Sequence, residues 1–268
     1  MEVCIEQQRR PDNASSPNED QLLSIVNGHG HGHDAIIPDS AKALHQHHVK
    51  QQQQPSFTYP LLDNVHFALE PPTKNGRTFV TRGKFKYFHY NCDGHNDVGW
   101  GCAYRTLQTV CSWIEDKLMD GRESVVPSIL EIQQLLVDIG DKPFEFFGSR
   151  DWIGAMEVFY VIDALYDIPC KIMHVPQRED LKKYANILKQ YFEDGGGVVM
   201  MGGDEDTSSK GIAGLHISGN QAYFLVIDPH YVGRPKSAEE LIQCGYVRWQ
   251  HSSEFVDSSF YNLCLPQI

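Results

Sequence analysis

Residues 99–118, GWGCAYRTLQTVCSWIEDKL, contain the clearest structural pattern of the chain. After the glycine-rich turn that opens it, apolar residues recur every three or four positions, a pattern typical of an amphipathic helix with one buried face. The members of this face are Ala103, Leu107, Val110, Cys111, Ile114 and Leu118. The sequence therefore predicts a long helix that begins next to Cys102 and packs against a core.

Cys102 is predicted to lie at or just before the first turn of this helix. Unpaired N–H groups and the positive end of the helix dipole favour a thiolate there and lower the pKa of the thiol. Gly99 and Gly101 allow backbone and substrate to approach closely. A free cysteine is more often a small buried core residue, and this interpretation is preferred for the cysteines that lie inside apolar patterns. These are Cys111, Cys170, Cys244 and Cys264.

A second motif, Asp228-Pro229-His230, follows the apolar run of residues 224–227. On an extended chain, residues two positions apart point to the same side. Asp228 can therefore hold the imidazole of His230 in one tautomer while the other ring nitrogen faces a thiol. A cysteine nucleophile needs such a base and such an orienting acid. By itself the motif is also compatible with an ordinary Asp-Pro turn.

The remaining pattern predicts an α+β domain. Residues 84–90 are rich in aromatics and partly alternate, which indicates a strand. Ser128 and Glu131 have capping-box spacing, which starts a second helix that stops at Gly140. Further helices are expected at about 154–166 and 179–193, and strands at 171–175, 198–201, 222–227, 246–249 and 260–265. Because helices mostly precede strands, we expect a helical side packed on a mostly antiparallel sheet.

Residues 1–56 differ in composition from the rest of the chain and are predicted to form a disordered tail rich in His and Gln. The apolar and aromatic residues of 57–268 suffice for a single catalytic domain. The tail histidines could bind metal weakly, although polar low complexity is the preferred interpretation. Cys92 and His95 could begin a zinc site, but no second close pair completes four ligands. No metal and no cofactor are therefore expected.

Charge and hydropathy argue against some classes of partner and some cellular locations. The formal net charge is −12 and there is no basic stripe, so nucleic acid is not an expected partner. The amino terminus lacks a signal-peptide pattern, and no apolar run approaches the roughly 18–20 residues of a membrane span. The seven cysteines are an odd number and widely spread. We therefore expect a cytoplasmic monomer that does not insert into a membrane.

Several separate motifs resemble those of the ubiquitin-fold-modifier-specific proteases, and the likeness covers about residues 80–268. The matching stretches are residues 90–94, 99–109, 140–143, 148–154, 228–231 and 261–266. The resemblance implies a papain-like cysteine peptidase that cleaves after the C-terminal glycine of the ubiquitin-fold modifier. Such an enzyme would mature the modifier precursor and remove the modifier from conjugated targets. The resemblance leaves open whether the chain matches the short or the long form of the family.

The resemblance also implies four roles. Cys102 matches the nucleophile, His230 the general base and Asp228 its orienting acid, while Tyr90 matches a tyrosine whose hydroxyl helps to form the oxyanion hole. The long form of the family reaches the endoplasmic reticulum through a folded N-terminal domain. The His/Gln-rich tail stands in its place here, so the main expectation is a cytoplasmic location, and recruitment to that surface is a secondary one. Two alternatives stay open. One is the autophagy-modifier protease family, which shares the Gly-Trp-Gly-Cys and Asp-Pro-His elements, and the other is an inactive adaptor that binds the modifier.

Overall fold

The computed structural model describes residues 57, 59–118 and 126–268, so the predicted tail lies outside the described residues. Its centre is a seven-stranded sheet in the order β2-β7-β3-β4-β5-β6, with β1 paired to β4. Every pairing is antiparallel. The strands are β1 (Arg77–Val80), β2 (Cys170–Val175), β3 (Val199–Gly203), β4 (Ser209–Ser218), β5 (Gln221–Ile227), β6 (Val247–His251) and β7 (Tyr261–Pro266).

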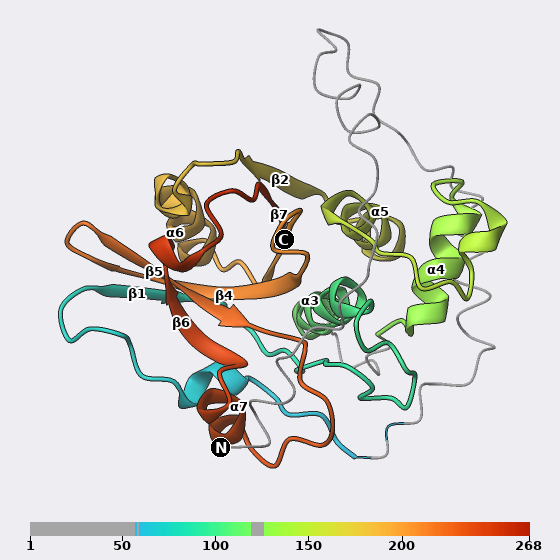
Figure 1. Ribbon diagram of the computed structural model, residues 1–268, viewed down its shortest axis with the longest axis horizontal. Helices are drawn as coiled ribbons and strands as arrows, with labels where there is room; N and C mark the ends of the chain where they lie inside the picture. The colour runs from blue at the N-terminus through green and yellow to red at the C-terminus, as the bar shows by residue number, and fades with distance from the viewer. Residues whose placement is uncertain (1–56, 58, 119–125) are drawn as a thin grey trace, which may run out of the picture.

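Helices cover both faces of this sheet. The α-helices are α3 (Cys102–Leu118), α4 (Ile129–Asp138), α5 (Ala155–Tyr166), α6 (Ala185–Glu193) and α7 (Ala238–Gln243). Short 3-10 turns are η2 (Val65–Ala68), η3 (Phe144–Phe146), η4 (Leu181–Tyr184) and η5 (Ser252–Glu254). Figure 1 shows α4 and α5 grouped beside α3, with α6 on the other side of the strands. The predicted α+β architecture, with helices packed on a mostly antiparallel sheet, is confirmed.

The pleat of the strands divides the core into two layers. Met200 of β3 and Cys264 of β7 pair across the sheet and belong to the cluster that includes α3, α4 and α5. Their neighbours Met201 and Leu263 also pair, and belong to the cluster that includes α6. Because successive strand residues point to opposite faces, one short strand serves both layers.

Helix α3 is buried more completely than its one apolar stripe predicts. All thirteen residues of Cys102–Ile114 are buried, including Arg105 and Gln108, which have no exposed surface. The helix lies between the sheet and the α4–α5 pair, so no side of its first three turns faces water. Its polar side chains are tolerated there because they hydrogen bond to neighbouring chain segments.

These hydrogen bonds also explain why the predicted strand over residues 84–90 is wrong. The segment is extended, but its backbone N–H groups donate to side chains of α3, to the side chain of Asn64 and to the carbonyl oxygens of Leu62 and Pro229, and not to a named strand of the sheet. Lys86 donates to Ser112 Oγ (2.9 Å) and Phe88 to Thr109 Oγ1 (3.2 Å). Only isolated bridges remain, one of them between Tyr90 and Val232. The aromatic pattern therefore correctly indicated that the segment is largely buried, but it wrongly indicated that the segment pairs as a strand.

The other predicted elements are present, with small shifts at their ends. Ser128 caps α4 through a full capping box with Glu131. The helix expected over 179–193 is divided into η4 and α6. Among the α-helices and strands of the described residues, β1, β4 and α7 were not predicted. Strand β4 contains glycines where the neighbouring strand packs closely against it. A Cβ at Gly214 would lie 2.9 Å from the carbonyl oxygen of Phe79 in β1.

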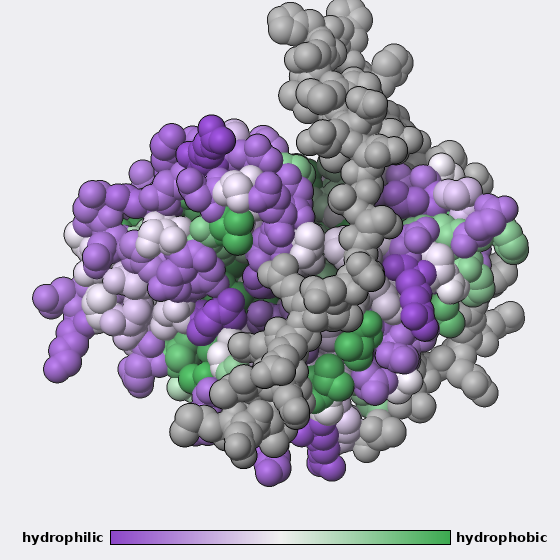
Figure 2. Space-filling model, in the orientation of Figure 1, coloured by the Kyte–Doolittle hydropathy of each residue, from purple (hydrophilic) through white to green (hydrophobic). Residues whose placement is uncertain are grey.

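The visible surface of the described part is mainly polar. Figure 2 shows hydrophilic residues over most of it, with smaller apolar patches between them. Among the described residues, no helix has both the length and the apolar composition that crossing a membrane requires.

Candidate active site

Cys102 is the first residue of α3, as the sequence pattern predicts. The turn before it places Gly99 at φ +88°, a left-handed conformation that favours glycine. The side chain is almost buried, with 8% of the residue exposed. The backbone of Ser209, at the start of β4, is close enough to the thiol to lower its pKa. The thiol therefore lies where the start of the central helix meets the sheet.

The sheet brings Asp228 and His230 to this thiol. Both residues follow the end of β5, and the Nδ1 atom of His230 lies 2.5 Å from Oδ1 of Asp228. The same carboxylate oxygen accepts the backbone N–H of His230 at 3.1 Å. His230 in turn is close enough to Cys102 for its hydrogen bonding and charge to lower the pKa of the thiol. The predicted order of acid, imidazole and thiol is therefore present in space.

The electrostatics of this group favour a thiolate beside an imidazolium. Burial alone would raise the pKa of Cys102, but the hydrogen bond and charge of His230 outweigh burial and lower that pKa. Burial likewise opposes the charged form of His230, yet its bonds to Asp228 and Cys102 raise the pKa of the imidazole to about 10. Despite burial, the same contact with His230 holds the pKa of Asp228 well below its usual value.

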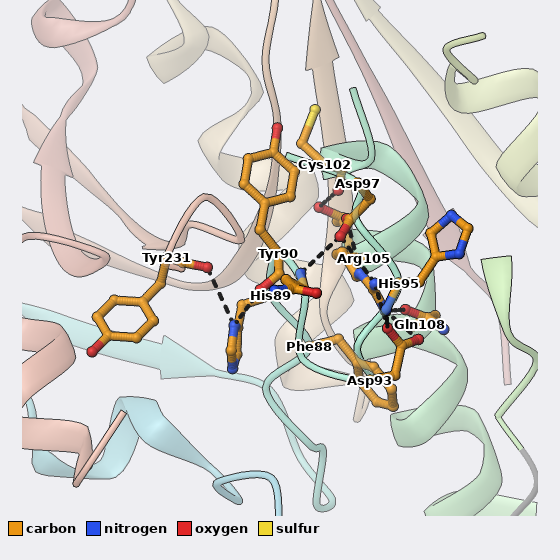
Figure 3. A network of polar contacts seen from close by, with 12 residues as sticks. Phe88, His89, Tyr90, Asp93, His95, Asp97, Cys102, Arg105, Gln108 and Tyr231 are labelled. Atoms are coloured by element: carbon orange, nitrogen blue, oxygen red, sulfur yellow. Dashed lines mark hydrogen bonds and ion pairs between the residues drawn. The ribbon is translucent and has the colours of Figure 1, made fainter. Parts of the chain in front are cut away.

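Tyr90 completes the group that the sequence singles out. Its ring meets the imidazole of His230 edge to face, with 5.1 Å between the ring centroids. Its hydroxyl is close enough to the Cys102 thiol and to the backbone of Gly99 for both to influence its pKa. In Figure 3 the Tyr90 ring and the Cys102 side chain lie side by side and point the same way. Burial, followed by the nearby thiolate, raises the pKa of Tyr90, so the hydroxyl keeps its proton and can donate it in a hydrogen bond.

Two residues that the sequence analysis did not identify hold Asp228 in place. The hydroxyl of Tyr87, which is fully buried, donates to the carbonyl oxygen of Asp228 at 2.6 Å. Arg248 of β6 places Nη1 3.5 Å from the free carboxylate oxygen. Tyr87 fixes the backbone and Arg248 faces the charge, so the acid keeps its orientation toward His230.

A buried arginine close to the thiol was also missed. Arg105 lies one helical turn after Cys102 and has no exposed surface. Its guanidinium forms ion pairs with Asp93 (2.8 Å) and Asp97 (2.9 Å) and donates to Gln108 (3.0 Å). Figure 3 shows this network beneath the thiol. A buried arginine is tolerated only with such partners, and nothing in the local sequence pattern shows that Arg105 has them.

Removing this cation should destabilise the fold strongly. We expect Arg105→Ala to lower the free energy of unfolding by about 3–5 kcal/mol, because Asp93 and Asp97 are left as buried charges without a partner. The control is Arg77→Ala, which breaks the exposed pair with Glu193 and should cost no more than about 1 kcal/mol. Denaturant unfolding of both variants measures the difference, and equal losses would contradict the expectation.

The other residues considered for metal chemistry lie elsewhere or have other partners. Cys92 is buried, and burial raises the pKa of its thiol to about 11. The ring of His95 packs edge to face on Trp100. Within the described ranges, no three His, Cys, Asp or Glu side chains cluster so that they could hold a metal ion.

The fold and this site together define a papain-like cysteine peptidase. The sequence model of peptidase family C78 matches residues 76–264, so the chain belongs to peptidase family C78. A solved structure, the crystal structure of UfSP from C. elegans, superimposes with a TM-score of 0.67 at 32% identity. The match covers 78% of this chain and 37% of that chain.

Relatives of known name share more of the sequence. The probable Ufm1-specific protease 1 of Drosophila melanogaster is 55% identical over 210 residues, which cover 78% of this chain and 88% of the fly protein. Ufm1-specific protease 1 of Mus musculus is 42% identical, with 78% and 96% covered. Ufm1-specific protease 2 of Homo sapiens is 41% identical, but only 43% of its length is covered.

Proposed function

We propose that this chain is a protease specific for Ufm1, the ubiquitin-fold modifier, and that it cleaves after the modifier's C-terminal glycine. It would mature the Ufm1 precursor and remove Ufm1 from conjugated proteins. The observation that carries the proposal is the contact between Cys102 and His230, with Asp228 behind the imidazole. The Ufm1-specific proteases among its relatives supply the substrate.

The geometry supports a two-step reaction. In the first step the Cys102 thiolate attacks the glycyl carbonyl carbon, and the negative charge moves to the carbonyl oxygen. The imidazolium of His230 then gives its proton to the leaving amine, which departs as a thioester forms. In the second step His230 takes a proton from water, the hydroxide attacks the thioester, and the glycine carboxylate leaves while the thiolate returns.

The oxyanion that forms in this reaction needs hydrogen-bond donors close to the sulfur of Cys102. We assign the hydroxyl of Tyr90 and the backbone N–H of Cys102 to this role, because both lie beside the sulfur and Tyr90 remains protonated. Donors that are held in place before reaction stabilise the developing charge at no cost of reorganisation.

Two substrates and two probes test the proposed function. The chain should release mature Ufm1 both from its precursor and from an isopeptide conjugate on a lysine. An electrophile at the C-terminus of Ufm1 should trap Cys102, whereas the same electrophile on an autophagy modifier should not. Trapping only by the autophagy modifier would replace the proposal with the rival protease, and binding of Ufm1 without turnover would favour an adaptor.

Tyr90→Phe tests the oxyanion role alone. We expect this variant to lower kcat for precursor cleavage by about 10²–10³-fold, the usual loss when one oxyanion donor is removed. KM should change little, because the hydroxyl contacts the transition state more than the bound substrate. Steady-state kinetics give both constants. Tyr223→Phe, which removes an exposed hydroxyl on β5, is the control. A wild-type kcat for Tyr90→Phe would remove Tyr90 from the mechanism.

A cytoplasmic location, with recruitment to the surface of the endoplasmic reticulum, and a monomeric state complete the proposal. Both come from the sequence expectations. Cell fractionation would check the first and analytical ultracentrifugation the second.

A further inference from the structure

We propose that Arg105 is a positioning residue that sets the Tyr90 hydroxyl against the Cys102 thiol by tying together the two ends of the loop between them. This inference rests on the proposed function and deepens it. The loop runs from Asn91 to Gly101 and connects the two side chains that would share one oxyanion. The span of this loop helps to fix their separation, together with the hydrogen bond from the backbone N–H of Tyr90 to the carbonyl oxygen of Pro229 (2.9 Å).

The start of the loop is tied to Asp97. Its Oδ1 atom accepts the backbone N–H of Asn91 at 2.7 Å, directly after Tyr90. The same oxygen accepts Nη2 of Arg105 at 3.0 Å, and Oδ2 accepts Nε at 2.9 Å. The guanidinium thus orients the carboxylate of Asp97, which restrains the backbone next to Tyr90.

The end of the loop is tied to the same residue. The carbonyl oxygen of Asp97 accepts the backbone N–H groups of Trp100 (3.1 Å) and Gly101 (2.8 Å), directly before Cys102. No side chain is tolerated at Gly101, because a Cβ there would lie 2.2 Å from Oδ2 of Asp97. Asp97 therefore holds both ends, and Arg105 holds Asp97.

The remaining N–H groups of Arg105 bind Asp93 and Gln108, which with Asp97 complete a cluster around the guanidinium. Nη1 and Nη2 donate to the two carboxylate oxygens of Asp93, each at 2.8 Å, and Nη1 also donates to Oε1 of Gln108. The side chains of both aspartates and of the arginine are buried, so the cluster is shielded from screening by salt. A planar guanidinium can satisfy this fixed set of acceptors, whereas a lysine ammonium cannot.

The cluster does not contact the reacting atoms. No hydrogen bond joins Arg105, Asp93 or Asp97 to Cys102 or His230 among the contacts of the described residues, and the thiolate is stabilised by His230. A change at Arg105 should therefore move Tyr90 relative to the thiol without changing the nucleophile itself. This separates positioning from a general effect on the site.

A double-mutant cycle between Arg105 and Tyr90 tests the inference. We expect Arg105→Lys to lower kcat for the Ufm1 precursor by about 10–10²-fold, the cost of misplacing a catalytic group by about 1 Å. Added to Tyr90→Phe, it should lower kcat by no more than about 3-fold further, because the group that it positions is already gone. The rate at which iodoacetamide alkylates Cys102 should stay within about 3-fold of wild type, since alkylation forms no oxyanion.

A matched control and a second variant keep the result clear. Glu157→Gln breaks a part-buried ion pair with Lys142 outside the site, and its effect should multiply with that of Tyr90→Phe. If a thermal melt shows that Arg105→Lys does not fold, Asp97→Asn enters the same cycle under the same criteria. Effects of Arg105 and Tyr90 that multiply, a wild-type kcat for a folded Arg105→Lys, or a large loss of alkylation would each overturn the inference.

The same assay separates this inference from the proposed function. If the wild-type chain leaves the Ufm1 precursor uncleaved, the proposed substrate is wrong. The cycle is then run on a fluorogenic glycyl ester, whose hydrolysis also passes through an oxyanion at Cys102. If the wild type cleaves the precursor and the cycle is multiplicative, only the role of Arg105 fails.

Discussion

Replacing Cys102 with serine should lower kcat for precursor cleavage by about 10⁴–10⁶-fold, the scale on which loss of a nucleophile acts in other hydrolases. The reason is specific to this site. His230 lowers the pKa of the thiol, so a thiolate is available before substrate arrives. A serine hydroxyl has a far higher pKa and would not ionise under the same influence.

The variant should still bind Ufm1, because the oxygen replaces the sulfur with little change in shape. Calorimetric titration with mature Ufm1 measures binding, and gel analysis of precursor cleavage measures turnover. Cys170→Ser is the matched control, since this free cysteine lies on edge strand β2 and contacts none of the site residues described above. Full cleavage by Cys102→Ser would contradict the mechanism, and full cleavage by Cys170→Ser is expected.

Local patterns predicted those parts of the fold whose partners lie close in sequence. The start of α3 and the Ser128 cap depend on neighbouring residues, and both were predicted correctly. The extended segment before α3 was wrongly predicted as a strand because alternation reports burial, not the identity of the hydrogen-bond partner. Its partners, Ser112 and Thr109, lie more than twenty residues away on a helix. Strand β4 was missed because its glycines serve close packing across the sheet.

The same distinction applies to the site. Asp228 and His230 could be predicted as a pair because they lie two residues apart on an extended chain. Tyr90 came only from resemblance, since nothing in its local pattern points toward Cys102. Arg105 could not be recognised from helical periodicity, because an arginine between apolar positions looks the same whether it faces water or two buried acids. Charge pairing over a folded loop is visible only in three dimensions.

Replacing His230 with alanine should have an effect of similar size, about 10⁴-fold or more on kcat, because the base, the acid for the leaving amine and the counter-charge of the thiolate are lost together. Alkylation of Cys102 should slow as well at neutral pH. Without the imidazolium, burial remains the largest influence on the thiol and raises its pKa. The thiolate fraction falls about tenfold for each unit of that rise.

The direction of the pH dependence follows from the two shifts. The pKa of Cys102 is lowered, so the acidic limb of the wild-type alkylation profile should lie below the ordinary thiol value. The pKa of His230 is raised to about 10, so the basic limb of kcat/KM should lie near pH 10, where the imidazolium loses the proton needed by the leaving amine. Between these two pKa values Cys102 is a thiolate and His230 is an imidazolium. Below the lower value the thiolate is protonated, and above the higher value the imidazolium loses its proton.

Asp228→Asn separates the two limbs. The carboxylate of Asp228 helps to raise the pKa of His230, so the amide should lower that pKa and move the basic limb of kcat/KM toward neutral pH. The acidic limb should remain, with a smaller amplitude. In His230→Ala the acidic limb of alkylation should instead move up. The control is His174→Ala, an exposed histidine that bonds to Asn262 on the neighbouring strand and should leave both limbs in place. An unchanged alkylation profile in His230→Ala would show that the helix start, and not the imidazolium, makes the thiolate.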